Sequence, residues 1–153
     1  MIARIAAALT ALTLALPAAA QIEIEDVTSP GGIDAWLVED PSIPFVALEF
    51  WFPGGTVLDP ADKRGATYLM TGLLEEGAAE MDAQAFAAEV EGLAAGFQFD
   101  AYRDAVVVSA RMLTQNRDAA AALLGAALTE PRFDPGAIER VRGQVVSIIE
   151  GDA

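Results

Sequence analysis

The protein has 153 residues, with 23 acidic against 9 basic side chains and a formal net charge of −14. The length fits one domain, and a hydrophobic content of 54% is too high for an intrinsically disordered chain. The negative charge repels nucleic-acid phosphates and anionic lipid headgroups, so neither nucleic acid nor a membrane surface is expected as a partner.

The first 20 residues have the pattern of a secretory signal peptide. Arg4 makes the start basic, residues 5–16 are apolar, and Ala18-Ala19-Ala20 after Pro17 form a small-residue cleavage motif. The apolar run is shorter than the ~20 residues of a transmembrane helix. We therefore expect a signal peptide over residues 1–20, export to the periplasm, and no membrane anchor after cleavage. Because the chain has no cysteine, its stability must come from packing alone.

Three strands are predicted after the signal peptide. Residues 22–27 alternate apolar and polar side chains, which is typical of a half-exposed strand, and residues 33–40 form a second strand after a turn. Residues 45–52, with the sequence FVALEFWF, are almost continuously apolar. Such a run predicts a central strand that is covered on both faces of its sheet.

Two helices are expected next. Residues 65–76 are predicted to be helical, with Gly77 as the glycine that ends the helix. Asp82 is expected to cap the following helix, because its carboxylate can accept hydrogen bonds from the first free N–H groups. Phe86 and Val90 lie one turn apart and form the apolar face of that helix.

A hairpin and two more helices complete the predicted fold. Residues 97–102 and 105–112 are expected to pair as strands. Asn116 or Asp118 is expected to cap the next helix, and Asp134 the last one. The order of elements predicts an α+β fold, in which an antiparallel or mixed sheet packs against helices on one face.

The residue types exclude several kinds of catalytic site. Without histidine or cysteine, neither Ser-His-Asp nor Cys-His catalysis is available. The turn Pro53-Gly54-Gly55 lacks the lysine and the spacing of a phosphate-binding loop. Adjacent helical residues point in different directions, so we interpret Glu75 and Glu76 as a solvated helix end and not as paired catalytic carboxylates.

The order of the elements, together with the segments GGTVLDPADKRGAT and FDPGAIERVR, resembles the N-terminal domain of the insulinase/pitrilysin family of zinc peptidases. These inverted zincins include the mitochondrial processing peptidases. The resemblance extends from about residue 22 to residue 151 and implies one peptidase-like domain over residues 21–153. Family domains end in further strands and occur in tandem, so we expect this domain to be incomplete.

In this family one helix carries the motif H-x-x-E-H, in which the histidines bind zinc and the glutamate activates water. A second glutamate on a later helix completes the metal site. The resemblance places Thr67 and Thr71 at the histidine positions and Met70 at the position of the glutamate. The later glutamate position falls near Ile148, with Glu150 as the nearest carboxylate.

These residue types remove the chemistry of the motif. A threonine hydroxyl stays protonated near neutral pH and cannot replace an imidazole as a strong zinc ligand. A methionine thioether cannot accept a proton from water, so Met70 cannot act as the base. We therefore expect no catalytic residue, no metal ligand and no cofactor in this chain. We interpret Thr67, Met70 and Thr71 as a helix face that serves packing.

The resemblance implies a non-catalytic subunit or homologue of an exported insulinase-family metallopeptidase, inactive by itself. Such a subunit would help form the chamber around unfolded peptides together with a zinc-bearing homologous subunit. Bacterial members of the family often pair a zinc-bearing chain with one that has lost the motif. The alternative is a structural or binding protein that reuses the scaffold without proteolysis. A co-purifying chain with an intact H-x-x-E-H would favour the first reading.

Overall fold

The computed structural model describes residues 23–151, with side chains over residues 23–147. The chain divides between Ser42 and Ile43 into two compact units, which are described separately below. The predicted signal peptide lies outside the described residues. Among the residues described, no helix is both long enough and apolar enough to cross a membrane.

The described residues of the first unit, 23–42, form one β-hairpin. Strands β1 (Glu25–Thr28) and β2 (Asp34–Leu37) are antiparallel, and the Thr28 hydroxyl donates a 2.7 Å hydrogen bond to the Asp34 carboxylate. Both strands are shorter than predicted, and all their residues are exposed where the alternating pattern predicted half-burial. Within residues 23–42, the two-stranded sheet has no second layer that covers its apolar side chains.

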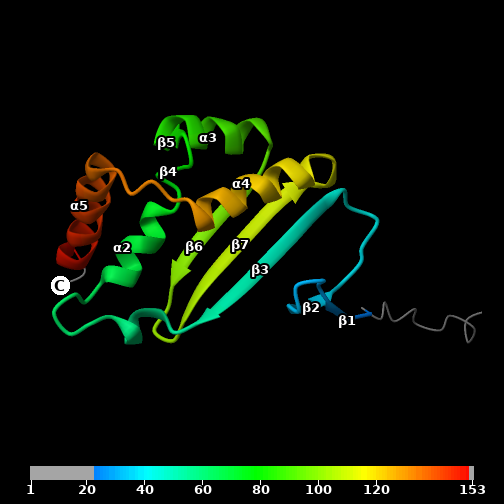
Figure 1. Ribbon diagram of the computed structural model, residues 1–153, viewed down its shortest axis with the longest axis horizontal. Coiled ribbons are helices and arrows are strands. Elements are labelled where there is room, and N and C mark those ends of the chain that lie inside the picture. Colours follow the sequence, from blue (N-terminus) through cyan, green and yellow to red (C-terminus); the bar gives the residue numbers. More distant parts are fainter. Residues whose placement is uncertain (1–22, 152–153) are drawn as a thin grey trace, which may run out of the picture. The chain divides into compact units, whose positions relative to one another are not determined.

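The second unit is built on a three-stranded antiparallel sheet with the order β3-β7-β6 (Figure 1). Its strands are β3 (Phe45–Pro53), β6 (Gly96–Ala101) and β7 (Ala105–Leu113). Strand β7 pairs with β3 along its whole length, from Phe45 opposite Leu113 to Pro53 opposite Ala105. The predicted hairpin between β6 and β7 is confirmed.

The prediction that β3 is a central strand is wrong. In the part of the chain that the structure describes, β7 is central and β3 lies at an edge. Large side chains of β3 are exposed, and Trp51 keeps 65% of its surface accessible. An apolar run indicates that both faces of a strand can be buried. It does not indicate how many neighbouring strands pair with its backbone, because pairing depends on N–H and C=O groups that every residue type except proline has.

Four helices and several short elements connect and cover the strands. Helix α2 (Ala66–Leu73) ends before Gly77, which has a φ of 115° and begins a short strand instead of ending the helix. The predicted cap of α3 is confirmed, because Asp82 accepts a 2.9 Å hydrogen bond from the Ala85 N–H. The remaining elements are η1 (Gly55–Leu58), β4 (Gly77–Ala78), β5 (Met81–Asp82), α3 (Ala83–Gly92), η2 (Thr114–Asn116), α4 (Arg117–Thr129) and α5 (Pro135–Gly151).

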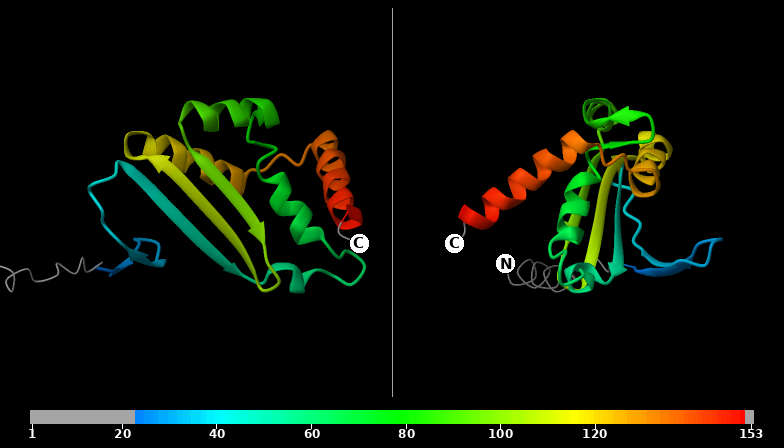
Figure 2. Two further views of the ribbon diagram at one scale, coloured as in Figure 1. Left: turned by 180° about the vertical axis from the view of Figure 1, so that it is seen from behind. Right: turned by 60° about the vertical axis from the view of Figure 1, so that its left-hand side comes forward.

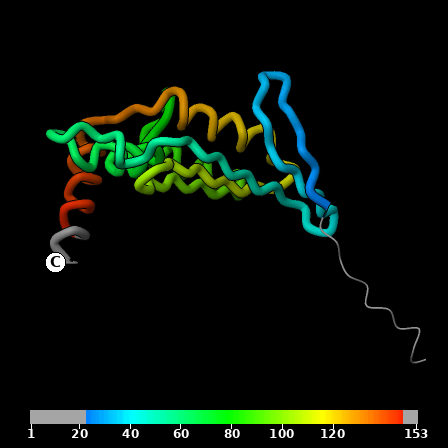
Figure 3. Tube along the Cα trace, turned by 90° about the horizontal axis from the view of Figure 1, so that it is seen from below, coloured from blue at the N-terminus to red at the C-terminus, as the bar shows by residue number. Residues whose placement is uncertain are grey.

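The main core lies between one face of the sheet and the helices. Figure 3 shows α4 on one side of the three strands. The core joins Leu74, after α2, with one residue of α3, four residues of α4 and alternate residues of β6 and β7: Ala78, Phe86, Phe97, Phe99, Val108, Ala110, Met112, Ala120, Leu123, Leu124 and Ala127. On the opposite sheet face Glu49, Gln98 and Arg111 are exposed. The predicted α+β fold with helices packed on one face of a sheet is therefore confirmed.

Candidate functional site

The loop that leads into α2 is fixed to the turn between β6 and β7. Three backbone hydrogen bonds of 2.8–2.9 Å join residues 54–57 to residues 102–104. Gly55 has a φ of 55°, and a Cβ at this position would lie 2.3 Å from the Tyr102 carbonyl oxygen. Only glycine allows this approach of two backbones, so Gly55 fixes the start of the loop against the turn between β6 and β7.

The N-terminal end of α2 is capped by Asp59. Its carboxylate accepts hydrogen bonds from the N–H of Gly65 (2.7 Å), the N–H of Thr67 (3.0 Å) and the hydroxyl of Thr67 (2.6 Å). These bonds favour the ionised carboxylate, and the Thr67 hydroxyl contributes most to lowering the pKa of Asp59. The hydroxyl of Thr67, at the first predicted histidine position, therefore donates its hydrogen bond to the carboxylate that caps its own helix.

The other two predicted motif positions have different surroundings. Thr71 is buried, with 3% of its surface exposed, and its hydroxyl donates a 2.9 Å hydrogen bond to the Tyr68 carbonyl in the preceding turn. Met70 is partly open to solvent and offers only a thioether. In the described part of the chain, no group of three or more histidine, cysteine, aspartate or glutamate residues could hold a metal ion. The side chains at these positions therefore do not fit a zinc ion.

Helix α5 packs against α2. In the family motif described above, the second glutamate lies on a later helix, so such packing would be needed to bring it near the histidine positions. Leu69 and Leu73 of α2 form a small apolar cluster with residues of α5: Ala137, Ile138, Val141 and Val145. The two helices run in opposite directions (Figures 1 and 2). Residues that follow Val141 therefore lie toward the N-terminal end of α2. The side chains of Ile148 and Glu150 lie outside the described residues, so their correspondence to the family's glutamate stays a prediction.

Glu75 and Glu76 follow the end of α2 at Leu73 and do not lie in its last turn. Glu75 is exposed, as the interpretation of a solvated helix end predicted, whereas Glu76 is partly buried. Glu76 forms an ion pair with Arg140 of α5 and so ties the two helices together. Desolvation by neighbouring groups, reinforced by the charges of Glu76 and Asp100, raises the pKa of Glu75, although its side chain remains exposed at the surface. Two adjacent carboxylates thus have different environments, which no local sequence pattern indicated.

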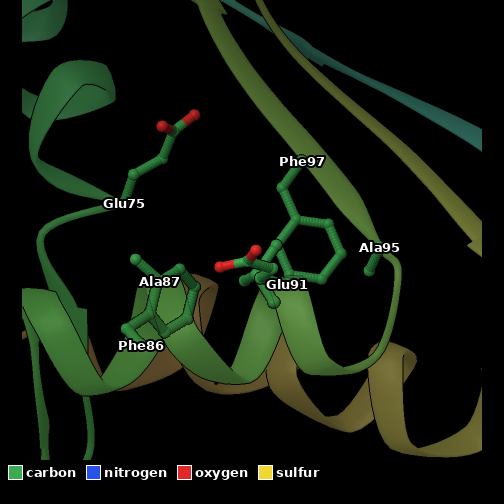
Figure 4. Close-up of a pocket in the computed structure, with 7 residues that line it drawn as sticks. Glu75, Phe86, Ala87, Glu91, Ala95 and Phe97 are labelled. Carbon is green, nitrogen blue, oxygen red and sulfur yellow. The ribbon is translucent and has the colours of Figure 1, made fainter.

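Glu75 lies at a pocket between α3, β6 and the segment that follows α2 (Figure 4). The pocket has a volume of about 340 Å³ and is lined by two carboxylates and five apolar side chains: Glu75, Glu91, Phe86, Ala87, Val90, Ala95 and Phe97. The helical periodicity of α3 predicted the apolar face of Phe86 and Val90. It did not predict that this face borders a cavity, because β6 supplies the opposite wall.

Comparisons with known proteins agree with this architecture. Residues 35–150 match the model of the family described as Insulinase (Peptidase family M16). No match was found among curated proteins.

Two solved structures are similar to the chain. The crystal structure of a peptidase M16 inactive domain from Pseudomonas fluorescens aligns with a TM-score of 0.77 and 28% identity, over 84% of this chain and 32% of that one. The crystal structure of pitrilysin aligns with a TM-score of 0.71 and 17% identity, over 86% of this chain and 14% of that one. The chain thus spans a third or less of the length of each, and the likeness to pitrilysin concerns the fold alone.

Proposed function

The chain belongs to the insulinase family, peptidase family M16, and on that premise we propose that it is a non-catalytic component of an exported metallopeptidase. In this proposal the chain helps enclose unfolded peptides in a chamber, and a homologous second subunit carries the zinc. The observation that carries the proposal is the set of side chains on α2: Thr67, Met70 and Thr71.

None of these three side chains can bind zinc strongly or take a proton from water, the two steps that the family motif performs in hydrolysis. In peptidases of the H-x-x-E-H type, zinc polarises the peptide carbonyl and the glutamate takes a proton from water. Here the hydroxyls of Thr67 and Thr71 donate hydrogen bonds within the protein, and Met70 has no basic atom. Helix α2 packs against α5 through apolar side chains. In this proposal these contacts hold the scaffold together in place of a metal site.

The relative from Pseudomonas fluorescens supports the same reading. That structure is described as an inactive domain of peptidase M16, and its fold covers most of this chain. A domain that keeps the fold and loses the ligands can still supply a wall of a chamber. Binding of an extended peptide is supported by β6, which lies at an edge of the sheet in the described residues and can pair with an added strand.

The proposal is tested by co-expression of the chain with a homologue that carries an intact H-x-x-E-H motif. We expect a stable complex on size-exclusion chromatography, one zinc per complex, and cleavage of an unfolded peptide that depends on the histidines of the homologue. The chain alone should retain no zinc after dialysis and cleave nothing. Stoichiometric zinc and peptidase activity in the purified chain would overturn the proposal.

Two further outcomes concern partner and location. If the chain binds no zinc-bearing homologue in this experiment, the scaffold serves a structural or binding role without proteolysis. Cell fractionation tests export, because the chain should be found in the periplasm and should be shorter by the first 20 residues. Retention in the cytoplasm at full length would contradict the predicted signal peptide.

A further inference from the structure

The pocket between α3 and β6 has an aromatic floor that is already part of the core. Phe86 and Phe97 are buried, with 2% and 8% of their surfaces exposed, and their ring centroids lie 6.4 Å apart. The volume of about 340 Å³ is at the lower end of the range of small-ligand pockets, which suits a single side chain better than a larger molecule.

The rim of the pocket carries negative charge without a counterion. Glu75 comes from the segment after α2 and Glu91 from α3, so two separate elements bring their carboxylates to one cavity (Figure 4). Within residues 23–147 neither carboxylate has an ion-pair partner, whereas the neighbouring Glu76 is paired with Arg140. Asp100 of β6 adds to the negative potential at Glu75.

From this arrangement we propose that the pocket binds a long basic side chain of a peptide, with its stem along Ala87, Val90 and Ala95 and its charged head between Glu75 and Glu91. Lysine and arginine side chains have an apolar stem and a charged tip, which matches an apolar floor beneath an acidic rim. A guanidinium group also forms paired hydrogen bonds with carboxylates. An acidic side chain is repelled, and a neutral one leaves the two carboxylates uncompensated.

The existence of the pocket is independent of the proposed function, but the choice of a peptide as the source of the side chain rests on it. The two can be tested separately. Peptide binding is measured on the full chain alone, whereas the proposed function is tested by association with a zinc-bearing homologue. If the chain fails to bind the peptide but still associates with the zinc-bearing homologue, only the assignment of the pocket is overturned. Lack of association with intact peptide binding would overturn only the role in the chamber.

The direct test compares the blocked peptide Gly-Gly-Arg-Gly-Gly with its citrulline analogue, which has nearly the same shape and no charge. By NMR titration of the full chain we expect the arginine peptide to bind about tenfold more tightly or better, as charge-assisted hydrogen bonds require. The largest shifts should appear around Phe97 and Val90. Equal binding of the two peptides, or shifts confined to another surface, would overturn the assignment.

Matched variants test whether the carboxylates of Glu75 and Glu91 bind the basic group. Glu75→Gln and Glu91→Gln should each reduce the preference for arginine over citrulline, and together they should abolish it. Glu89→Gln is the control, because Glu89 lies on α3 but does not line the pocket. Circular dichroism of each variant establishes that the fold is retained. An unchanged preference in the folded double variant would refute the proposal.

Acidification gives a second readout. The raised pKa of Glu75 means that this group becomes protonated at a higher pH than an ordinary glutamate. Arginine binding should therefore weaken as the pH falls through that raised pKa, before an ordinary glutamate is protonated. Glu91 lines the same pocket, and the charges of Glu76 and Asp100 act on Glu75, so the comparison is made between the natural chain and Glu75→Gln. If both show the same pH profile, Glu75 does not hold the basic group.

Discussion

The Thr67 hydroxyl donates a 2.6 Å hydrogen bond to the Asp59 carboxylate, and this bond closes the loop that leads into α2. The position that the family resemblance assigns to a zinc-binding histidine therefore stabilises the start of a helix. The Asp59 carboxylate caps the helix by accepting from the N–H groups of Gly65 and Thr67, and the Thr67 hydroxyl donates a third hydrogen bond to the same carboxylate. The residue at this position therefore has a structural role at the start of α2.

Replacing Thr67 with valine should destabilise the protein by about 1 kcal/mol, because the hydroxyl-to-carboxylate bond is lost while the branched shape is kept. Urea unfolding followed by circular dichroism measures the change. Thr67→Ser is the control, since it retains the hydroxyl and should lose less. Equal losses in the two variants would show that the methyl group matters and the hydrogen bond does not.

The stability due to Asp59 should depend on pH in a defined direction. Its pKa in the folded protein is lowered from the ordinary value of 3.8, so the ionised form is favoured by folding. The stabilisation is fully present above that ordinary value and is lost as the pH falls through the lower pKa of the folded state. Asp59→Asn should therefore lower the melting temperature at neutral pH and have progressively less effect in acid. A constant difference across this range would contradict the assignment.

Replacing Gly72 with alanine should lower stability by about 1 kcal/mol or more, although alanine is the better helix former. A Cβ at this position would lie 2.9 Å from Cγ1 of Val141, so the Val141 side chain or the helix that carries it must shift. Gly125→Ala is the matched control in α4, where nothing lies within 4 Å of the added atom, and it should stabilise. Thermal unfolding compares the two, and stabilisation by both changes would refute the close contact.

The exposed apolar residues of β3 should promote self-association of the chain. Trp51 is 65% exposed on an edge strand, whose free backbone groups can pair with another copy. Trp51→Lys should reduce association in sedimentation experiments over a range of protein concentrations, without a large loss of stability. Tyr102→Lys changes an exposed aromatic residue in a turn and serves as the control. Similar effects of both substitutions would indicate nonspecific hydrophobic association and not pairing of β3 edges between two copies of the chain.

Local signals in the sequence predicted several elements correctly. The Asp82 cap forms as expected, since a carboxylate next to its own helix needs no distant partner. The hairpin of β6 and β7 forms as expected, because its turn joins strands that are adjacent in the chain. Asn116 precedes α4 as predicted, but its amide donates to the Leu93 carbonyl and makes no cap. That contact links residues distant in sequence, and a local pattern cannot contain it.

The sequence by itself determined that the helix lacks zinc ligands and a base at Thr67, Met70 and Thr71, and that the chain has an α+β pattern of elements. Residue type alone decides whether an atom can bind a metal or accept a proton. Only the tertiary structure placed β3 at an edge, joined Glu76 to Arg140, and brought Glu75 and Glu91 to one cavity. These outcomes depend on contacts between distant segments, whose energies come from burial and charge pairing that no single stretch of sequence contains.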